Sequence, residues 1–243
     1  MPVSIPGRRL PARAVAARAT GARERAAQAT RDSILHAAIK VFARDGYDGG
    51  RIEQISKAAR SYDRMIYYYF GSKEGLFIEV LEEIYRRFNE AEARLELDLA
   101  DPVAALKSVI HFVWTYYQAH PEFITLLNTE NLHKGRHISR SLRATEYSSP
   151  AVGLIGRVLA SGVRKGVFRG DLRARDVYLM IVGMCYFYLS NRHTLSVFLG
   201  EELEASSELA RWESFVADSV LRVVSPAAAL RESTPASRAG ADR

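Results

Sequence analysis

One stretch, residues 51–76 (RIEQISKAARSYDRMIYYYFGSKEGL), constrains the fold of this 243-residue chain more than any other. Its apolar residues recur at helical spacing, first at Ile52 and Ile55 and then at Ile66 and Phe70. The pattern predicts two short helices joined by a tight turn, followed by the start of a longer helix. A short helix that presents Arg, Asp and Tyr outward over a small apolar underside fits the major groove of DNA. A solvated helix of an ordinary helical domain gives the same pattern.

The charge of the chain is concentrated near this stretch. Residues 1–75 hold 14 Lys and Arg against 7 Asp and Glu, a net +7, whereas the remaining residues sum to −1. Such a split is typical of a phosphate-contacting domain joined to a neutral one. Residues 1–22 are rich in Arg, Ala and Pro, and we expect a disordered basic arm. The arm either lies against DNA or serves as a solubilising tail without contacts.

Composition narrows the class of protein. A hydrophobic content of 48% is ample for a core, and the single cysteine, Cys185, excludes an intramolecular disulfide. The apolar run around Cys185 is too short to span a bilayer, and the N-terminus has no apolar segment of a secretory signal. We therefore expect a cytoplasmic protein with no membrane partner.

The pattern beyond residue 76 predicts helices only. No segment alternates with a period of two, whereas Pro and Gly repeatedly mark helix ends. The expected helices cover residues 24–45, 51–59, 62–70, 72–97, a set of shorter segments starting at Pro102, Pro121 and Pro150, and finally 173–190 and 206–224.

A family resemblance rests on many spaced positions over about residues 25–80. They are Ile34, Leu35, Ala38, Phe42, Gly46, Tyr47, Ile55, Ala58, Ala59, Ile66, Tyr67, Tyr69, Phe70, Lys73, Glu74 and Leu76. Together they resemble the DNA-binding domain of the TetR/AcrR transcriptional regulators; the rest of the chain resembles the family only in being all-helical and of suitable length. The resemblance implies an all-α chain with a three-helix helix-turn-helix domain over 23–71. It also implies a helical ligand-binding and dimerisation domain over 72–225. Residues 226–243 are rich in Ala, Arg, Ser and Pro, and we expect a disordered tail there.

The resemblance also implies roles for single residues. Tyr67 and Lys73 resemble a tyrosine and a lysine that contact phosphates, and Arg64 is the best candidate to read a base, because a guanidinium forks onto guanine. Asp63 either accepts from a cytosine amine or holds Arg64 in place. The full set of candidate DNA contacts is Arg51, Gln54, Lys57, Ser61, Tyr62, Asp63, Arg64, Tyr67, Tyr68 and Lys73.

Three positions depart from the family pattern. Arg60 stands where a turn glycine is usual, and a positive φ there would cost about 1 kcal/mol, so we expect another turn shape. Tyr62 replaces the usual capping Ser or Thr, and we expect Ser61 to cap instead and to shift the helix start. Arg64 replaces a small residue.

The last two expected helices, 173–190 and 206–224, suggest an interface. The first is apolar almost all round and must be covered on both sides. Either a partner chain covers it, as in a TetR-type homodimer, or the helix is deeply buried in a monomer.

The second domain offers a mixture of aromatic and polar groups that suits a small, mainly apolar ligand or equally a plain core. The candidate pocket residues are His111, Trp114, Tyr117, Phe123, Asn128, Asn131, Tyr186 and Phe187. We expect neither a cofactor nor a metal, since His133 and His137 with Glu130 nearby offer too few ligands. No catalytic motif is present, and an enzyme using Cys185 or the histidines is a third hypothesis.

These observations predict a ligand-responsive, homodimeric DNA-binding regulator, a repressor that binds a palindromic operator. The helix over 72–97 would connect ligand and DNA by changing the spacing of the two reading heads. The alternative is an activator, or a broad-specificity DNA binder of the same fold without an inducer.

Overall fold

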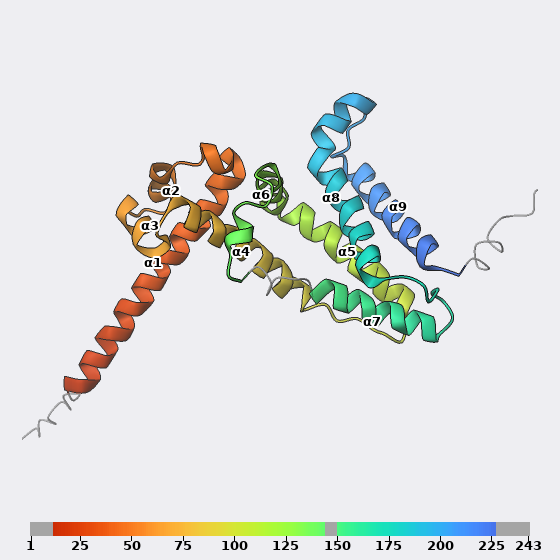
Figure 1. Ribbon diagram of the computed structural model, residues 1–243, viewed down its shortest axis with the longest axis horizontal. Helices are drawn as coiled ribbons and strands as arrows, with labels where there is room; N and C mark the ends of the chain where they lie inside the picture. Colours follow the sequence, from red (N-terminus) through yellow and green to blue (C-terminus); the bar gives the residue numbers. More distant parts are fainter. Residues whose placement is uncertain (1–11, 144–149, 227–243) are drawn as a thin grey trace, which may run out of the picture. The chain divides into compact units, whose positions relative to one another are not determined.

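The computed structural model describes residues 12–143 and 150–226 (Figure 1). All regular structure in these residues is helical, which confirms the predicted all-α class. The expected tail and the first part of the expected arm lie outside the described residues. No described helix is both long and apolar enough to cross a bilayer.

The helices follow one another with short connections. They are α1 (Ala12–Gly49), α2 (Ile52–Ala58), α3 (Asp63–Phe70), α4 (Lys73–Glu92), α5 (Pro102–Ala119), α6 (Pro121–Leu132), the 3-10 helix η1 (Ile138–Arg140), α7 (Pro150–Arg164), α8 (Ala174–Leu199) and α9 (Ser206–Val224). The chain divides into two compact units, the N-terminal unit (Met1–Val80) and the C-terminal unit (Leu81–Arg243).

The N-terminal unit packs α2, α3 and the start of α4 against α1. Its fully buried side chains are Ile34, Ala38, Phe42, Ile55, Ile66, Leu76, Phe77 and Val80. The rings of Phe42 and Phe77 meet edge to face with centroids 5.1 Å apart. Because Phe77 belongs to this core, the division between the units falls inside α4 at Val80, whereas the sequence suggested a division before the helix, at residue 72.

Helix α1 differs from its expected bounds at both ends. It begins at Ala12, not near Glu24, so residues 12–22 are helical where we expected a disordered arm. Alanine and arginine are strong helix formers, which accounts for the extension. At the other end, Gly46 takes φ 70° and ψ −179° and breaks the helix as the sequence predicted.

The C-terminal unit is built around α5, which packs against α6, α7, α8 and α9. Leu106, Ile110 and Trp114 of α5 are all but fully buried. Helix α8 continues to Leu199, beyond the expected end at residue 190, and closes on the left-handed Gly200. The polar residues Asn191 and Arg192 lie inside the helix, so the prediction that the helix ends before them is wrong.

Helix α4 ends at Glu92, earlier than the expected residue 97. Beyond that point, the Arg94 and Leu95 amides donate to carbonyls three residues back, at 3.3 and 3.0 Å. Hydrogen bonds of this 3-10 type end the α-helix.

Candidate nucleic-acid interface and candidate ligand cavity

The turn between α2 and α3 keeps a tight shape despite its arginine. Arg60 adopts φ 51°, so the expectation of another turn shape is wrong. The Arg60 amide donates to the Lys57 carbonyl at 3.1 Å and the Ser61 amide to the Ser56 carbonyl at 2.9 Å. These two bonds form a Schellman motif, in which the left-handed residue is usually glycine. The two hydrogen bonds offset the backbone strain at Arg60.

The start of α3 is fixed by a contact with α2. Tyr62 is the N-cap residue in an extended conformation without a side-chain cap bond, so the expected shift to a Ser61 cap is wrong. Instead the buried Ser56 hydroxyl donates to Asp63 Oδ1. A carboxylate is also favoured in the first turn of a helix, where the helix dipole is positive. Asp63 therefore holds α3 against α2, which is neither of the two roles expected from the sequence.

The outer face of α3 carries aromatic and basic groups. Tyr62, Tyr67 and Tyr68 are 71%, 53% and 77% exposed, whereas Ile66 beneath them is fully buried. The Arg64 guanidinium lies 5.3 Å from the centre of the Tyr62 ring. This cation–π contact orients the guanidinium on an otherwise open surface.

Lys73 is the first residue of α4, and its ammonium is held in place. Nζ lies 4.8 Å from the Tyr47 ring centre and donates to the Asp48 carbonyl at 3.3 Å. The Ser72 hydroxyl caps α4 by accepting from the Gly75 amide at 2.9 Å. The ammonium and the positive end of α4 thus lie together, an arrangement that suits a phosphate.

Three candidates lie at the start of α2 or on it and are exposed. Gln54 Oε1 accepts from the Arg51 amide at 3.0 Å and so caps α2, which leaves its NH₂ group for a ligand. Arg51 and Lys57 flank it. All ten candidate DNA contacts therefore belong to the N-terminal unit, on α2, on α3, in the turn between them or at the start of α2 or α4.

A cavity of about 400 Å³ lies in the C-terminal unit between α4, α5, α6 and α8. Four of the eight predicted pocket residues line it: Tyr117, Phe123, Asn131 and Tyr186. The others in its wall are Tyr85, Phe88, Asn89, Leu127, Tyr178, Leu179, Val182 and Gly183.

The cavity wall is aromatic with hydroxyl and amide groups. Phe123 stacks on Phe88 and on Tyr117, each with centroids 5.5 Å apart, and meets Tyr85 edge to face. Burial raises the pKa of Tyr85 to about 12 and raises the pKa of Tyr117 well above its ordinary value. Both phenols stay neutral at physiological pH, as an ordinary tyrosine does, and a neutral phenol can donate a hydrogen bond. The wall suits a small, largely apolar molecule with a few polar atoms.

Four predicted pocket residues do not line this cavity. His111 faces outward and bonds Glu213 at 2.6 Å, and Trp114 is 1% exposed and packs against the Tyr188 ring. Asn128 lies behind the wall, where it accepts from the Tyr186 hydroxyl. Phe187 is 57% exposed. Spacing alone did not reveal which side of each helix faces inward.

Helical spacing could have identified some of the cavity-lining residues that the sequence analysis missed. Tyr178, Val182 and Tyr186 recur at intervals of four on α8 and share one face. Tyr85 and Asn89 flank Phe88 on α4, three residues before it and one after it. The sequence pattern places Phe88 in an apolar stripe, and the two flanking positions were not predicted.

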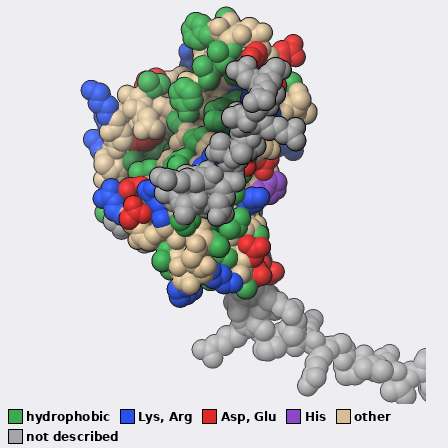
Figure 2. Space-filling model, turned by 90° about the vertical axis from the view of Figure 1, so that its right-hand side faces the viewer, with side chains coloured by type: hydrophobic (Ala, Val, Ile, Leu, Met, Phe, Trp, Pro, Cys, Tyr) green, Lys and Arg blue, Asp and Glu red, His purple; other side chains and the backbone are tan. Residues whose placement is uncertain are grey.

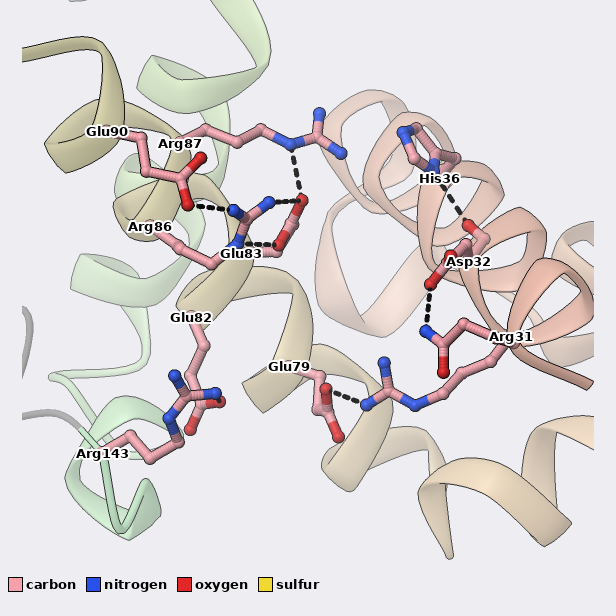
Figure 3. Close-up of polar contacts among 11 residues, drawn as sticks. Arg31, Asp32, His36, Glu79, Glu82, Glu83, Arg86, Arg87, Glu90 and Arg143 are labelled. Carbon is pink, nitrogen blue, oxygen red and sulfur yellow. Dashed lines mark hydrogen bonds and ion pairs between the residues drawn. The ribbon is translucent and has the colours of Figure 1, made fainter. Parts of the chain in front are cut away.

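Polar contacts fix α4 on both sides of the division at Val80. In the N-terminal unit Arg31 of α1 pairs with Glu79 at 2.5 Å (Figure 3). In the C-terminal unit Glu82 accepts from the Ser141 hydroxyl at 2.5 Å. Within the helix, Glu83 pairs with Arg86 and Arg87, each at 2.7 Å. One continuous helix thus links the cavity wall to Lys73.

Helices α8 and α9 expose apolar side chains on the C-terminal unit, and Figure 2 shows apolar groups gathered on one face of the molecule. Leu179 and Phe187 on α8 are 55% and 57% exposed, and Phe215 and Val223 on α9 are 51% and 40% exposed. A Cβ added to Gly183 would meet nothing within 4 Å. This set of five residues is called the α8–α9 face below.

His137 and Cys185, the residues considered for metal binding and for catalysis, are both buried. The buried His137 donates from its backbone and bonds through Nδ1 to Glu130, at 2.8 and 2.7 Å. No cluster of three possible metal ligands occurs in the described part of the chain. Burial raises the pKa of the Cys185 thiol to about 12, which disfavours a nucleophilic thiolate.

Two family models match the chain. Residues 34–80 match the model described as "Bacterial regulatory proteins, tetR family", and residues 102–220 match "Tetracyclin repressor-like, C-terminal domain". Among solved structures, that of the transcriptional regulator SCO4942 from Streptomyces coelicolor superposes with a TM-score of 0.59 at 22% identity, over 80% of this chain and 98% of that one.

Curated relatives extend the similarity to function. "HTH-type transcriptional repressor NicS" of Pseudomonas putida is 56% identical over 200 residues, which is 82% of this chain and 94% of that protein. "HTH-type transcriptional repressor SCO4008" of Streptomyces coelicolor is 30% identical, over 66% of this chain and 78% of the other. The chain therefore belongs to the TetR family and is a DNA-binding transcriptional regulator with an N-terminal helix-turn-helix domain.

Proposed function

We propose that the chain is a homodimeric repressor whose two α3 helices enter successive major grooves of a palindromic operator. A small, mainly apolar ligand bound in the cavity would release it. Two relatives are named as repressors, which supports repression rather than activation. A regulator of bacterial genes acts on the chromosome, so we place it in the cytoplasm, without enzymatic activity of its own.

The observation that carries the ligand response is the course of α4. Tyr85, Phe88 and Asn89 of this helix line the cavity, and the same helix begins at Lys73. A ligand that fits one position of α4 better than another would change the affinity for DNA. Equal fit to both positions would change nothing, however tight the binding.

The homodimer rests on the α8–α9 face. One recognition helix reads too few bases for useful specificity, and symmetric dimers solve this by reading two half-sites. Covering Leu179, Phe187 and Phe215 with the same face of a second copy would remove their apolar surface from water.

The ligand response is tested by a screen followed by a cavity-filling variant. Neutral small molecules that raise the melting temperature of the wild type are added to the protein bound to a duplex that it selected from a random pool. We expect at least one to weaken DNA binding, and Val182→Trp, which fills the cavity, to bind DNA without responding.

The control is Leu132→Trp, since Leu132 is 82% exposed and does not line the cavity. This variant should respond like the wild type. Stabilising compounds that never weaken DNA binding would contradict the proposal and favour a regulator without an inducer.

A further inference from the structure

Helix α1 carries a run of exposed residues ahead of the part that packs in the core of the N-terminal unit. Eight consecutive residues, 22–29, are exposed although they lie within a helix. A helix exposed on every side gains nothing from a core, and isolated helices of this length are marginal in water. The structure therefore leaves this segment available for a partner.

The charge of the segment indicates an anionic partner. Over residues 12–30 the sequence holds four arginines, Arg13, Arg18, Arg23 and Arg25, against one acid, Glu24. Arg23 and Arg25 are exposed and form no ion pair with any described residue. Arg31 differs, because Glu79 holds it at 2.5 Å and its guanidinium lies over the Phe70 ring.

The C-terminal end of this part of α1 lies close to α3 and to the turn that precedes it. Ser33 of α1 donates to the Ala59 carbonyl at 3.1 Å, at the turn that precedes α3. Arg31 contacts Phe70, the last residue of α3, at 5.0 Å from its ring centre. The part of α1 that directly follows the segment therefore lies beside both the C-terminal end of α3 and the turn that precedes α3.

We infer that the helical segment 12–30 is a second DNA-contacting element, which binds phosphates beside the sequence read by α3 and carries no base specificity of its own. Its 19 residues span about 28 Å, or about eight base pairs. Arginines on such a helix contact phosphates of any sequence, because each charge displaces condensed counterions.

The test measures salt dependence with the full chain. The variant Arg23→Gln/Arg25→Gln keeps helix-forming side chains and removes two charges per chain. Dissociation constants are measured by fluorescence anisotropy between about 50 and 200 mM salt. Two duplexes of equal length are used, one selected by the wild type from a random pool and one scrambled.

The matched control removes two charges elsewhere. Arg157→Gln/Arg164→Gln changes two exposed residues of α7, which make no ion pair with described residues either. This variant has the same net charge as the test variant.

The inference predicts that Arg23→Gln/Arg25→Gln weakens binding to both duplexes by the same factor. The slope of log K against log salt should become shallower by about 0.9 for each phosphate that the variant no longer neutralises. The control should keep the wild-type slope.

An unchanged slope would overturn the inference and leave a solvated helix. A weakening confined to the selected duplex would also overturn it, because it would mean base reading. The inference rests on DNA binding by the chain, and a wild type that enriches no duplex from the random pool would refute that function separately.

Discussion

The two units place the tyrosines of their candidate sites in opposite ways. In the N-terminal unit Tyr62, Tyr67 and Tyr68 stand exposed on α3 beside Arg64, over a closed core. In the C-terminal unit Tyr85 and Tyr117 turn inward and enclose a cavity of about 400 Å³. Outward phenols beside a guanidinium suit a large anionic partner, whereas inward phenols suit a small one. The difference supports the proposal that DNA and a small ligand are recognised by separate parts of the chain.

The exposed apolar groups of the α8–α9 face form a third case. Of this set, Phe187, Phe215 and Val223 neither belong to the candidate DNA contacts nor line the cavity, and in the proposed dimer a second copy buries them. We predict that Phe187→Glu gives the largest effect of any single change, because it places a carboxylate of each copy in the apolar interface. Affinity for the selected duplex should fall about 100-fold, or about 2.7 kcal/mol.

Analytical ultracentrifugation of Phe187→Glu should find a folded monomer. Leu132→Glu, at a position 82% exposed at the end of α6, is the control and should remain dimeric. A Phe187→Glu protein that stays dimeric would mean that another surface joins the copies.

The next effect separates base reading from phosphate contact within α3. Arg64→Ala should cost about 1 kcal/mol at each half-site on the selected duplex. It should cost little on a scrambled one. Selection from a random pool with this variant should give a sequence that is less defined at one position of each half-site. A sequence preference identical to that of the wild type would remove Arg64 from the base readers.

A smaller and uniform effect is expected for the phosphate contacts. Tyr67→Phe and Lys73→Ala should each weaken binding to selected and scrambled duplexes alike, by about 0.5–1.5 kcal/mol for Tyr67. For Lys73→Ala the salt slope should also become shallower by about 0.9 per neutralised phosphate. Anisotropy titrations check both, and an effect seen only on the selected duplex would assign these residues to base reading instead.

The smallest expected effect concerns stability, not binding. Arg60→Gly relieves the left-handed backbone at φ 51° and should stabilise the fold by up to about 1 kcal/mol. The melting temperature should rise by about 2–4 °C. Calorimetry measures the shift, and Lys57→Gly, in the last turn of α2, should lower the melting temperature instead. A drop for Arg60→Gly would show that the side chain itself stabilises the turn.

The sequence predicted the N-terminal unit more closely than the C-terminal unit, for a physical reason. The bounds of α2 and α3 were right to within one residue or two, because turns and local spacing determine them. The contact between Ser56 and Asp63 was missed, since it joins two helices and depends on their packing. The end of α8 was misplaced because a polar residue does not by itself stop a helix.

The cavity was only half predicted for a related reason. A helix such as α8, with apolar groups nearly all round, gives no periodicity to distinguish its inner from its outer face. Phe187 was therefore expected in the pocket and Tyr178 was not, although the structure places them the other way. Only the packing of α8 against α5 and α6 decides which residues face inward.

The proposed repressor function depends on the N-terminal unit reading one half of a symmetric DNA site. The most direct test is to select duplexes with the wild type and to determine the footprint and the number of bound chains. We predict an inverted repeat with half-sites one helical turn apart, about 10 base pairs, or a multiple of it. An even number of chains should be bound, with α3 variants altering both halves alike. A single unrepeated site bound by one chain would contradict the symmetric reading.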